Sequence, residues 1–168
     1  MNIAARFTLP LLSLALAGAL LAGAPACGNG TSGAGGGGGS APSACAGDPR
    51  TQVYAAGLQA ASTDGTMKLT FVGAQPAPPQ KGTNTWTVHL TDGSGKSIDG
   101  ATILVKPFMP DHNHGSSITP QIMPMGSGDY HVELLDFFMP GVWQNTFTIT
   151  PAGGGAPATV VFTFCVDG

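Results

Sequence analysis

Apolar side chains recur at every second position in most of the chain beyond Cys45, and this alternation limits the possible folds more than any other feature. The segments that show it lie at residues 67–72, 85–91, 101–108, 130–134, 143–149 and 160–164. Trp86, Leu134 and Trp143 are among the positions expected to face the core. A period of two places successive side chains on opposite faces of a β-strand, so each segment predicts a strand with one buried face. The helical period is absent, which excludes a helical fold.

A further short strand is expected near residues 118–123, which brings the total to about seven strands. Turn sequences such as Asp92-Gly93-Ser94-Gly95 and Gly126-Ser127-Gly128 separate the strands, and such sequences are typical of connections between antiparallel strands. We therefore predict an all-β fold, an immunoglobulin-like antiparallel β-sandwich. A small closed barrel is the alternative that the strand spacing leaves open.

The first 26 residues have the pattern of a signal peptide. One positive charge precedes a mostly apolar run at residues 7–22, and Ala24-Pro25-Ala26 satisfies the small-x-small rule for cleavage directly before Cys27. This site resembles the lipobox of bacterial lipoproteins, although Ala24 stands where leucine is usual. The resemblance implies lipidation of Cys27, a membrane anchor and a location in the cell envelope, facing the periplasm or the cell exterior. Ordinary secretion is the alternative.

Residues 27–47 form the predicted anchor and tether, and residues 48–168 form the folded domain. The run from Gly35 to Gly39 and its glycine-rich surroundings are typical of a flexible linker. Only 9% of all residues are charged, and the formal net charge is -3. No basic surface is available to neutralise phosphates, so nucleic acid is not an expected partner.

The chain has three cysteines, an odd number for an oxidising compartment. If Cys27 carries lipid, Cys45 and Cys165 remain as a pair and predict a disulfide between the start of the domain and its last strand. Two unpaired thiols are the alternative.

The connection after residue 108 carries the residues best suited to chemistry. It reads Met109-Pro110-Asp111-His112-Asn113-His114-Gly115. Imidazole nitrogen and thioether sulfur together favour copper over other biological metals. Two histidines at i and i+2 lie on one face if the loop is extended, and Asp111 is expected to orient one of them from behind.

This loop and the later Met139-Pro140-Gly141-Val142-Trp143 turn, together with Gly128-Asp129-Tyr130, resemble the YtkA-like domain of bacterial envelope proteins. The resemblance covers roughly residues 66–150. It implies an immunoglobulin-like sandwich related to envelope domains that are associated with copper handling, without a settled activity.

Strand parity predicts which loops share an end of the sandwich. Counting antiparallel strands from Met67 places the loops at 74–82, 109–117 and 138–141 together, which would bring the candidate ligands Met109, His112, His114 and Met139 close to one another. Met123 and Met125 are expected nearer the other end, and their role stays open. His89 and His131 are out of phase with the buried positions and are expected to face outward.

We therefore expect an envelope-anchored module that binds or handles copper. A metal-free structural or protein-interaction domain, with an envelope protein as its partner, is the alternative. An enzyme is not expected: Asp111, His112 and Ser116 are close in sequence but lack a nucleophile elbow, and the chain has no His-Glu-x-x-His zinc motif.

Overall fold

The computed structural model describes residue 43 and residues 45–168. The predicted signal peptide (1–26), the predicted lipid-anchor residue Cys27 and the tether as far as residue 42 lie outside the described residues. Within the described part, no helix is long and apolar enough to cross a membrane.

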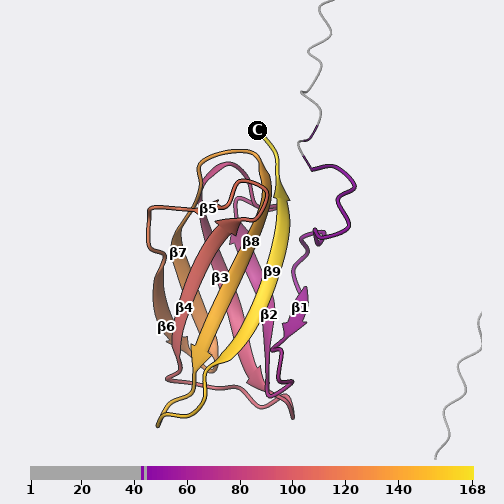
Figure 1. Cartoon of the computed structure of the whole chain (residues 1–168). Helices are drawn as coiled ribbons and strands as arrows, with labels where there is room; N and C mark the ends of the chain where they lie inside the picture. The colour runs from indigo at the N-terminus through magenta and orange to yellow at the C-terminus, as the bar shows by residue number, and fades with distance from the viewer. Residues whose placement is uncertain (1–42, 44) are drawn as a thin grey trace, which may run out of the picture. The chain divides into compact units, whose positions relative to one another are not determined.

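Two antiparallel sheets make up the described domain (Figure 1). The strands are β1 (Gln59–Ala61), β2 (Met67–Gln75), β3 (Gly82–Asp92), β4 (Thr102–Met109), β5 (His114–Gly115), β6 (Gln121–Gly126), β7 (Asp129–Phe137), β8 (Gly141–Thr150) and β9 (Ala158–Val166). One sheet has the order β1-β2-β3-β7-β6 and the other β5-β4-β8-β9. The predicted all-β sandwich is confirmed, and β1 and β5 are short additions to its long strands.

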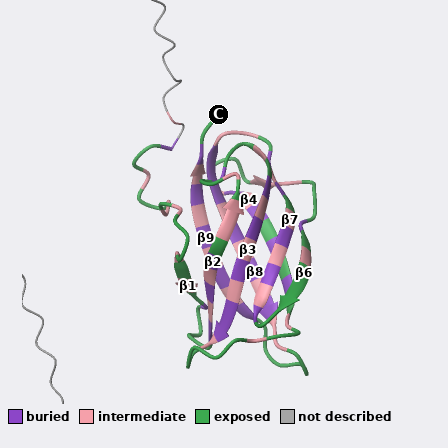
Figure 2. Ribbon diagram, turned by 180° about the vertical axis from the view of Figure 1, so that it is seen from behind, coloured by how far each residue is buried: buried purple, intermediate pink, exposed green. Residues whose placement is uncertain are grey.

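The core lies between the two sheets and is rich in aromatic rings. Figure 2 shows buried residues alternating with partly exposed ones along β2, β3 and β9, as a two-residue period requires. The Phe71 ring meets the rings of Phe162 and Trp86 edge-on, with centroid distances of 4.7 Å and 5.0 Å. Trp86 and Trp143 are both fully buried, so their expected core positions are confirmed.

Two details of the strand prediction are corrected by the structure. Leu134 was expected to face the core, but it is exposed, and Leu135 is buried in its place. Leu134 has a φ of 58° and lies where the register of β3 with β7 shifts, so a β-bulge resets the alternation. The short strand expected at 118–123 is found at 121–126, because Ile118 N–H donates to Ser116 Oγ in a turn that precedes it.

The first described residues cover the outer edge of β9. Gln52 N–H donates to Thr163 O at 2.8 Å, and Thr163 N–H donates to Gln52 Oε1 at 2.9 Å. Cys45 forms a disulfide with Cys165 in β9, with 5.5 Å between the Cα atoms, so the predicted pairing is confirmed. An edge strand that is paired and covered in this way offers no free template for aggregation.

Antiparallel connectivity places the loops at two ends. The His-loop end, as we call it, carries the connections 76–81, 110–120 and 138–140, as well as the C-terminus (Figure 1). The opposite end carries the connections 93–101, 127–128 and 151–157. The loops predicted to share an end therefore do so.

Candidate metal site

β4 and β5 place a methionine and a histidine side by side at the His-loop end. Met109 is the last residue of β4, His114 is the first residue of β5, and the two are register partners. Partners across an antiparallel pair point to the same face of the sheet. Met109 is fully buried, so His114 is turned towards the interior as well.

The His114 ring lies among aromatic side chains. It stacks on the Phe138 ring with 5.2 Å between centroids, and the Trp143 ring meets it edge-on at 6.5 Å. The His114 Nδ1 atom is buried and has no hydrogen-bond partner among the described residues. Leaving a buried polar atom unpaired costs about 1–3 kcal/mol, so such an atom in a native fold calls for an explanation.

His112 lies next to His114, but by a different backbone path from the one expected. The ring centroids are 5.6 Å apart. The loop is not extended between them: His112 N–H donates to Met109 O at 3.3 Å, and Asn113 has a φ of 53°. Asparagine tolerates this left-handed conformation better than most residues. A tight turn therefore brings together the two imidazoles, of which His112 is the exposed one.

Met139 reaches the same end from the connection between β7 and β8. Its side chain packs against the core, and its carbonyl oxygen accepts a hydrogen bond from Trp143 Nε1 at 2.9 Å. Nearby Gly141 has a φ of 137°, and a Cβ atom built there would lie 2.5 Å from the Met109 Cε atom. Glycine at this position therefore allows the Met109 thioether to reach the start of β8, directly after Met139.

Asp111 has a different partner from the one expected. Its carboxylate accepts two hydrogen bonds from Arg50, at 2.7 Å from Nη1 and 2.8 Å from Nη2. Among the described residues it makes no hydrogen bond to His112 or His114. The hydrogen bonds from Arg50 lower the pKa of Asp111, and they lower the pKa of Asp48 to about 2. Asp111 is thus part of an ion-pair cluster with Arg50 and Asp48 rather than a direct support for an imidazole.

The family to which the chain belongs follows from a comparison with family models. The model described as YtkA-like matches residues 59–148. The chain belongs to the YtkA-like family. The match contains Met109, His112, His114 and Met139, whereas Arg50 and the disulfide lie outside it.

Solved structures add a distant similarity. A copper-bound variant of FetP from uropathogenic Escherichia coli aligns with a TM-score of 0.45 and 16% identity, over 67% of this chain and 96% of that chain. FetP from the same source as isolated aligns with a TM-score of 0.43 and 16% identity, over 66% and 96%. No curated protein sequence gives a significant match.

The remaining histidines of this YtkA-like domain lie on the outer face of the five-stranded sheet. His131 is the register partner of the exposed Met123, and its Nε2 atom lies 3.3 Å from Glu133 Oε1. His89 Nδ1 lies 2.6 Å from Asp129 Oδ1, and its Nε2 atom lies 3.2 Å from Ser97 Oγ. This Ser–His–Asp order matches that of a hydrolytic triad, but Ser97 is exposed and none of the described pockets includes the three residues. We interpret these two contacts as a structural link that holds the 93–101 connection next to β7.

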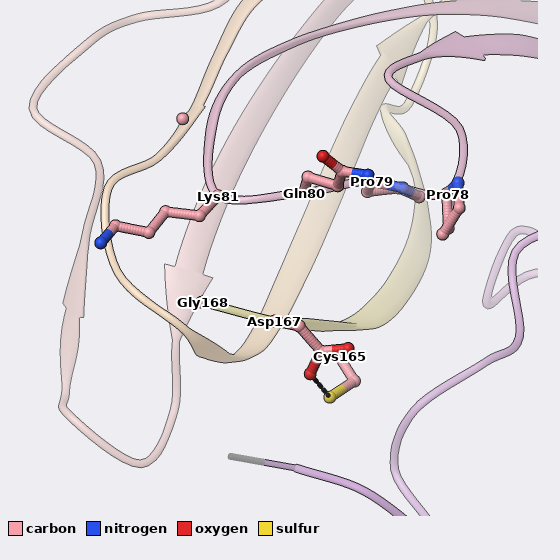
Figure 3. Close-up of a pocket in the computed structure, with 8 residues that line it drawn as sticks. Pro78, Pro79, Gln80, Lys81, Cys165, Asp167 and Gly168 are labelled. Atoms are coloured by element: carbon pink, nitrogen blue, oxygen red, sulfur yellow. Dashed lines mark hydrogen bonds between the residues drawn. The ribbon is translucent and has the colours of Figure 1, made fainter. Parts of the chain in front are cut away.

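A pocket of about 690 Å³ also opens at the His-loop end, beside the disulfide (Figure 3). It is lined by residues 78–82 together with Cys165, Asp167 and Gly168. Cys45, Cys165 and Asp167 lie close enough to share an ion. Both sulfurs are committed to the disulfide, and thiolates are what a metal would need, so this group is not a candidate site.

Two residues near the candidate site were not anticipated from the sequence. Arg50 is 61 residues from Asp111, and no pattern links them. Phe138 is an exposed aromatic residue directly before Met139. Its place at the end of an alternating strand, directly before a candidate ligand, is the signal in the sequence that could have marked it.

Proposed function

We propose that this YtkA-like domain is an envelope-anchored module that binds one copper ion through His112, His114, Met109 and Met139. The observation that carries the proposal is the buried, unpaired Nδ1 atom of His114 beside the buried Met109. A metal ion would supply the missing partner. The residues present therefore fit a metal at this place on the grounds of their own chemistry.

The set of donors favours copper, and Cu(I) in particular. Imidazole binds several transition metals, but thioether sulfur is a soft donor that selects Cu(I). The two kinds of donor differ in depth: Met109 is fully buried, whereas His112 is exposed. An ion held here would have its thioether side towards the core and an imidazole facing the solvent.

The proposed role is binding rather than catalysis. Ser116, the hydroxyl closest in sequence to the two histidines, accepts a hydrogen bond from Ile118 N–H at 3.1 Å. Its place in this turn supports a structural function. The expected partner is an envelope protein that receives the ion or delivers it.

Anchoring is a separate part of the proposal and rests on the sequence before residue 43. Replacing Cys27 with serine should move the mature protein from the membrane fraction to the soluble fraction, because the lipid chain supplies the membrane affinity. Equal membrane retention of C27S and the parent would contradict the lipoprotein proposal and would leave secretion as the alternative.

The copper site is tested by titrating the purified protein with Cu(I) against a competing chelator, and with Cu(II) separately. The parent should bind one equivalent. The H112A/H114A variant should lose Cu(II) binding and bind Cu(I) more weakly, because only the thioethers remain. The sandwich should stay folded, because His112 is exposed and β5 is only two residues long, with some loss of stability where the His114 ring packs on Phe138.

The matched control is His131→Ala, which removes an imidazole from the sheet face without touching the His-loop end. It should titrate like the parent. If the parent binds no copper at micromolar concentrations, or if H112A/H114A equals the parent, the site does not exist and the metal-free interaction domain becomes the better explanation.

A further inference from the structure

One side chain joins the first described residues to the loop that carries the histidines. Arg50 donates two parallel hydrogen bonds to the Asp111 carboxylate, at 2.7 Å and 2.8 Å. It also donates from Nη2 to Asp48 Oδ2 at 2.6 Å and from Nε to Asp48 Oδ1 at 3.0 Å. All the side-chain nitrogens of Arg50 are thus used, and the guanidinium lies between two carboxylates.

The segment that carries Arg50 is itself held in place from both sides. Five residues earlier, the disulfide joins Cys45 to β9. Two residues later, Gln52 exchanges two hydrogen bonds with Thr163 of β9. Between them, Thr51 N–H and Thr51 Oγ1 both donate to Asp48 O, at 3.0 Å and 2.8 Å. Arg50 therefore extends from a fixed point on the four-stranded sheet.

The other partner belongs to the loop whose position matters for the ion. Asp111 directly precedes His112, and a backbone hydrogen bond from His112 N–H to Met109 O closes the 109–112 turn. That bond is long, at 3.3 Å. Because His112 is exposed, little packing fixes its ring near His114. The ion pair from Arg50 therefore adds a restraint on the side of the loop that precedes His112.

We infer that Arg50 is a positioning residue for the proposed copper site, acting through Asp111 on the His112 loop. The inference rests on the proposed function. The ion pair between Arg50 and Asp111 holds the loop in the conformation that binds the ion. Copper binding then does not have to supply the free energy for ordering the loop. The affinity for copper then depends on the segment next to the predicted tether, and on the disulfide that fixes this segment.

The first test is a double-mutant cycle on the ion pair between Arg50 and Asp111. Arg50→Gln, Asp111→Asn and the double variant are titrated with Cu(I) and a competing chelator. Each single variant should bind about five-fold more weakly, which is within the range measured for partly exposed ion pairs. The double variant should be no weaker than either single one, because both remove the same contact. R50K should recover part of the affinity, since lysine keeps the charge but loses the fork geometry.

Controls separate positioning from folding. Lys68→Gln removes a positive charge from β2, away from the loop, and should leave the affinity unchanged. Thermal unfolding and near-ultraviolet circular dichroism of R50Q should match those of the parent. Copper affinity in R50Q equal to that of the parent, or additive losses of affinity in the double variant, would contradict the positioning role of Arg50. A parent that binds no copper would instead overturn the proposed function, so the two failures are distinguishable.

The second test concerns the disulfide. Cys45→Ala/Cys165→Ala should weaken copper binding in the parent background by about the same five-fold factor, because the fixed point of Arg50 is lost. The same pair of substitutions should have no effect on affinity in R50Q. An equal loss in both backgrounds would show that the disulfide acts independently of Arg50 and would overturn the coupling. If the cysteine variant fails to fold, the cycle between Arg50 and Asp111 decides the inference alone.

Discussion

The two ends of the sandwich treat their polar side chains differently. At the opposite end, Tyr130 Oη donates to Ile98 O at 3.0 Å and accepts from Ala101 N–H at 2.9 Å. Asp99 Oδ1 accepts from Gly128 N–H at 2.7 Å. The side chains that define this end thus satisfy one another and the turns around them, which is the usual arrangement for groups with a structural role.

At the His-loop end a polar atom is left over. His114 Nδ1 is buried without a partner among the described residues, and the rings of Phe138 and Trp143 lie beside the His114 ring. The comparison teaches a way of separating structural histidines from candidate ligands. His89 has both nitrogens within hydrogen-bond distance of neighbours in the domain, whereas His114 has one nitrogen for which the described chain supplies nothing.

The largest effect should come from Met109, which belongs to both the core and the site. Met109→Ala should lower the free energy of unfolding by about 2–5 kcal/mol, the range for truncating a fully buried side chain, and should also weaken Cu(I) binding. Met109→Leu keeps the volume, so it should cost less than about 1.5 kcal/mol while the thioether is still lost. Urea unfolding and Cu(I) titration of both variants check this. Parent-like Cu(I) affinity in M109L would remove Met109 from the site.

Met109 was predicted as part of the connection after residue 108, but β4 extends through it, and its side chain continues the inward alternation of Ile103 and Val105. Period-two alternation reports the direction of a side chain in any strand that packs on a single core. The same reasoning placed Trp86 and Trp143 correctly. It was wrong at Leu134, because a bulge depends on the fit between neighbouring strands and not on the residues of one strand.

The sequence predicted which candidate ligands lie at the same end of the sandwich, but not how they are arranged there. Parity brought His112 and His114 to the same end as Met139, whereas the left-handed Asn113 between the histidines could not be anticipated. The ion pair between Asp111 and Arg50 could not be predicted from the sequence for a different reason. An ion pair across 61 residues leaves no periodic trace in the sequence.

The opposite end should respond in stability alone. Tyr130→Phe leaves the ring in the core but removes the hydroxyl that joins Ile98 to Ala101. The free energy of unfolding should fall by about 1 kcal/mol, because the two hydrogen bonds that the hydroxyl makes to partly buried backbone groups are lost. Cu(I) affinity should equal that of the parent. A change in affinity would show that the two ends are coupled and would break the comparison.

Two methionines at different ends give a smaller and cleaner contrast. Met139→Leu should weaken Cu(I) binding about ten-fold, equivalent to about 1.4 kcal/mol, with little change in stability because leucine fills a similar volume. Met125→Leu is the matched control, since Met125 is exposed in β6 on the way to the opposite end. Equal affinity in both variants would mean that Met139 packs beside the site without binding the ion.

The smallest effect concerns acid, and it separates copper release from unfolding by pH. At the opposite end, Asp64 accepts hydrogen bonds from Ser62 and Thr66, and Asp92 accepts them from Ser94 and Lys96. These bonds lower the pKa values of both carboxyls, with the serine hydroxyl as the main cause in each case.

A carboxyl whose pKa is lower in the folded state than in the unfolded chain stabilises the fold above the unfolded value, about 3.9 for aspartate. That contribution is lost as the pH falls through the folded pKa.

Copper binding responds at higher pH, because protons compete directly for the imidazoles. On acidification the protein should therefore release Cu(II) first, while urea unfolding midpoints stay constant until about pH 4 and then fall. The D64N/D92N variant should show a shallower fall between about pH 4 and pH 2 with unchanged copper release. If its midpoints follow those of the parent through this range, the turn carboxylates do not stabilise the opposite end in the way the hydrogen bonds indicate.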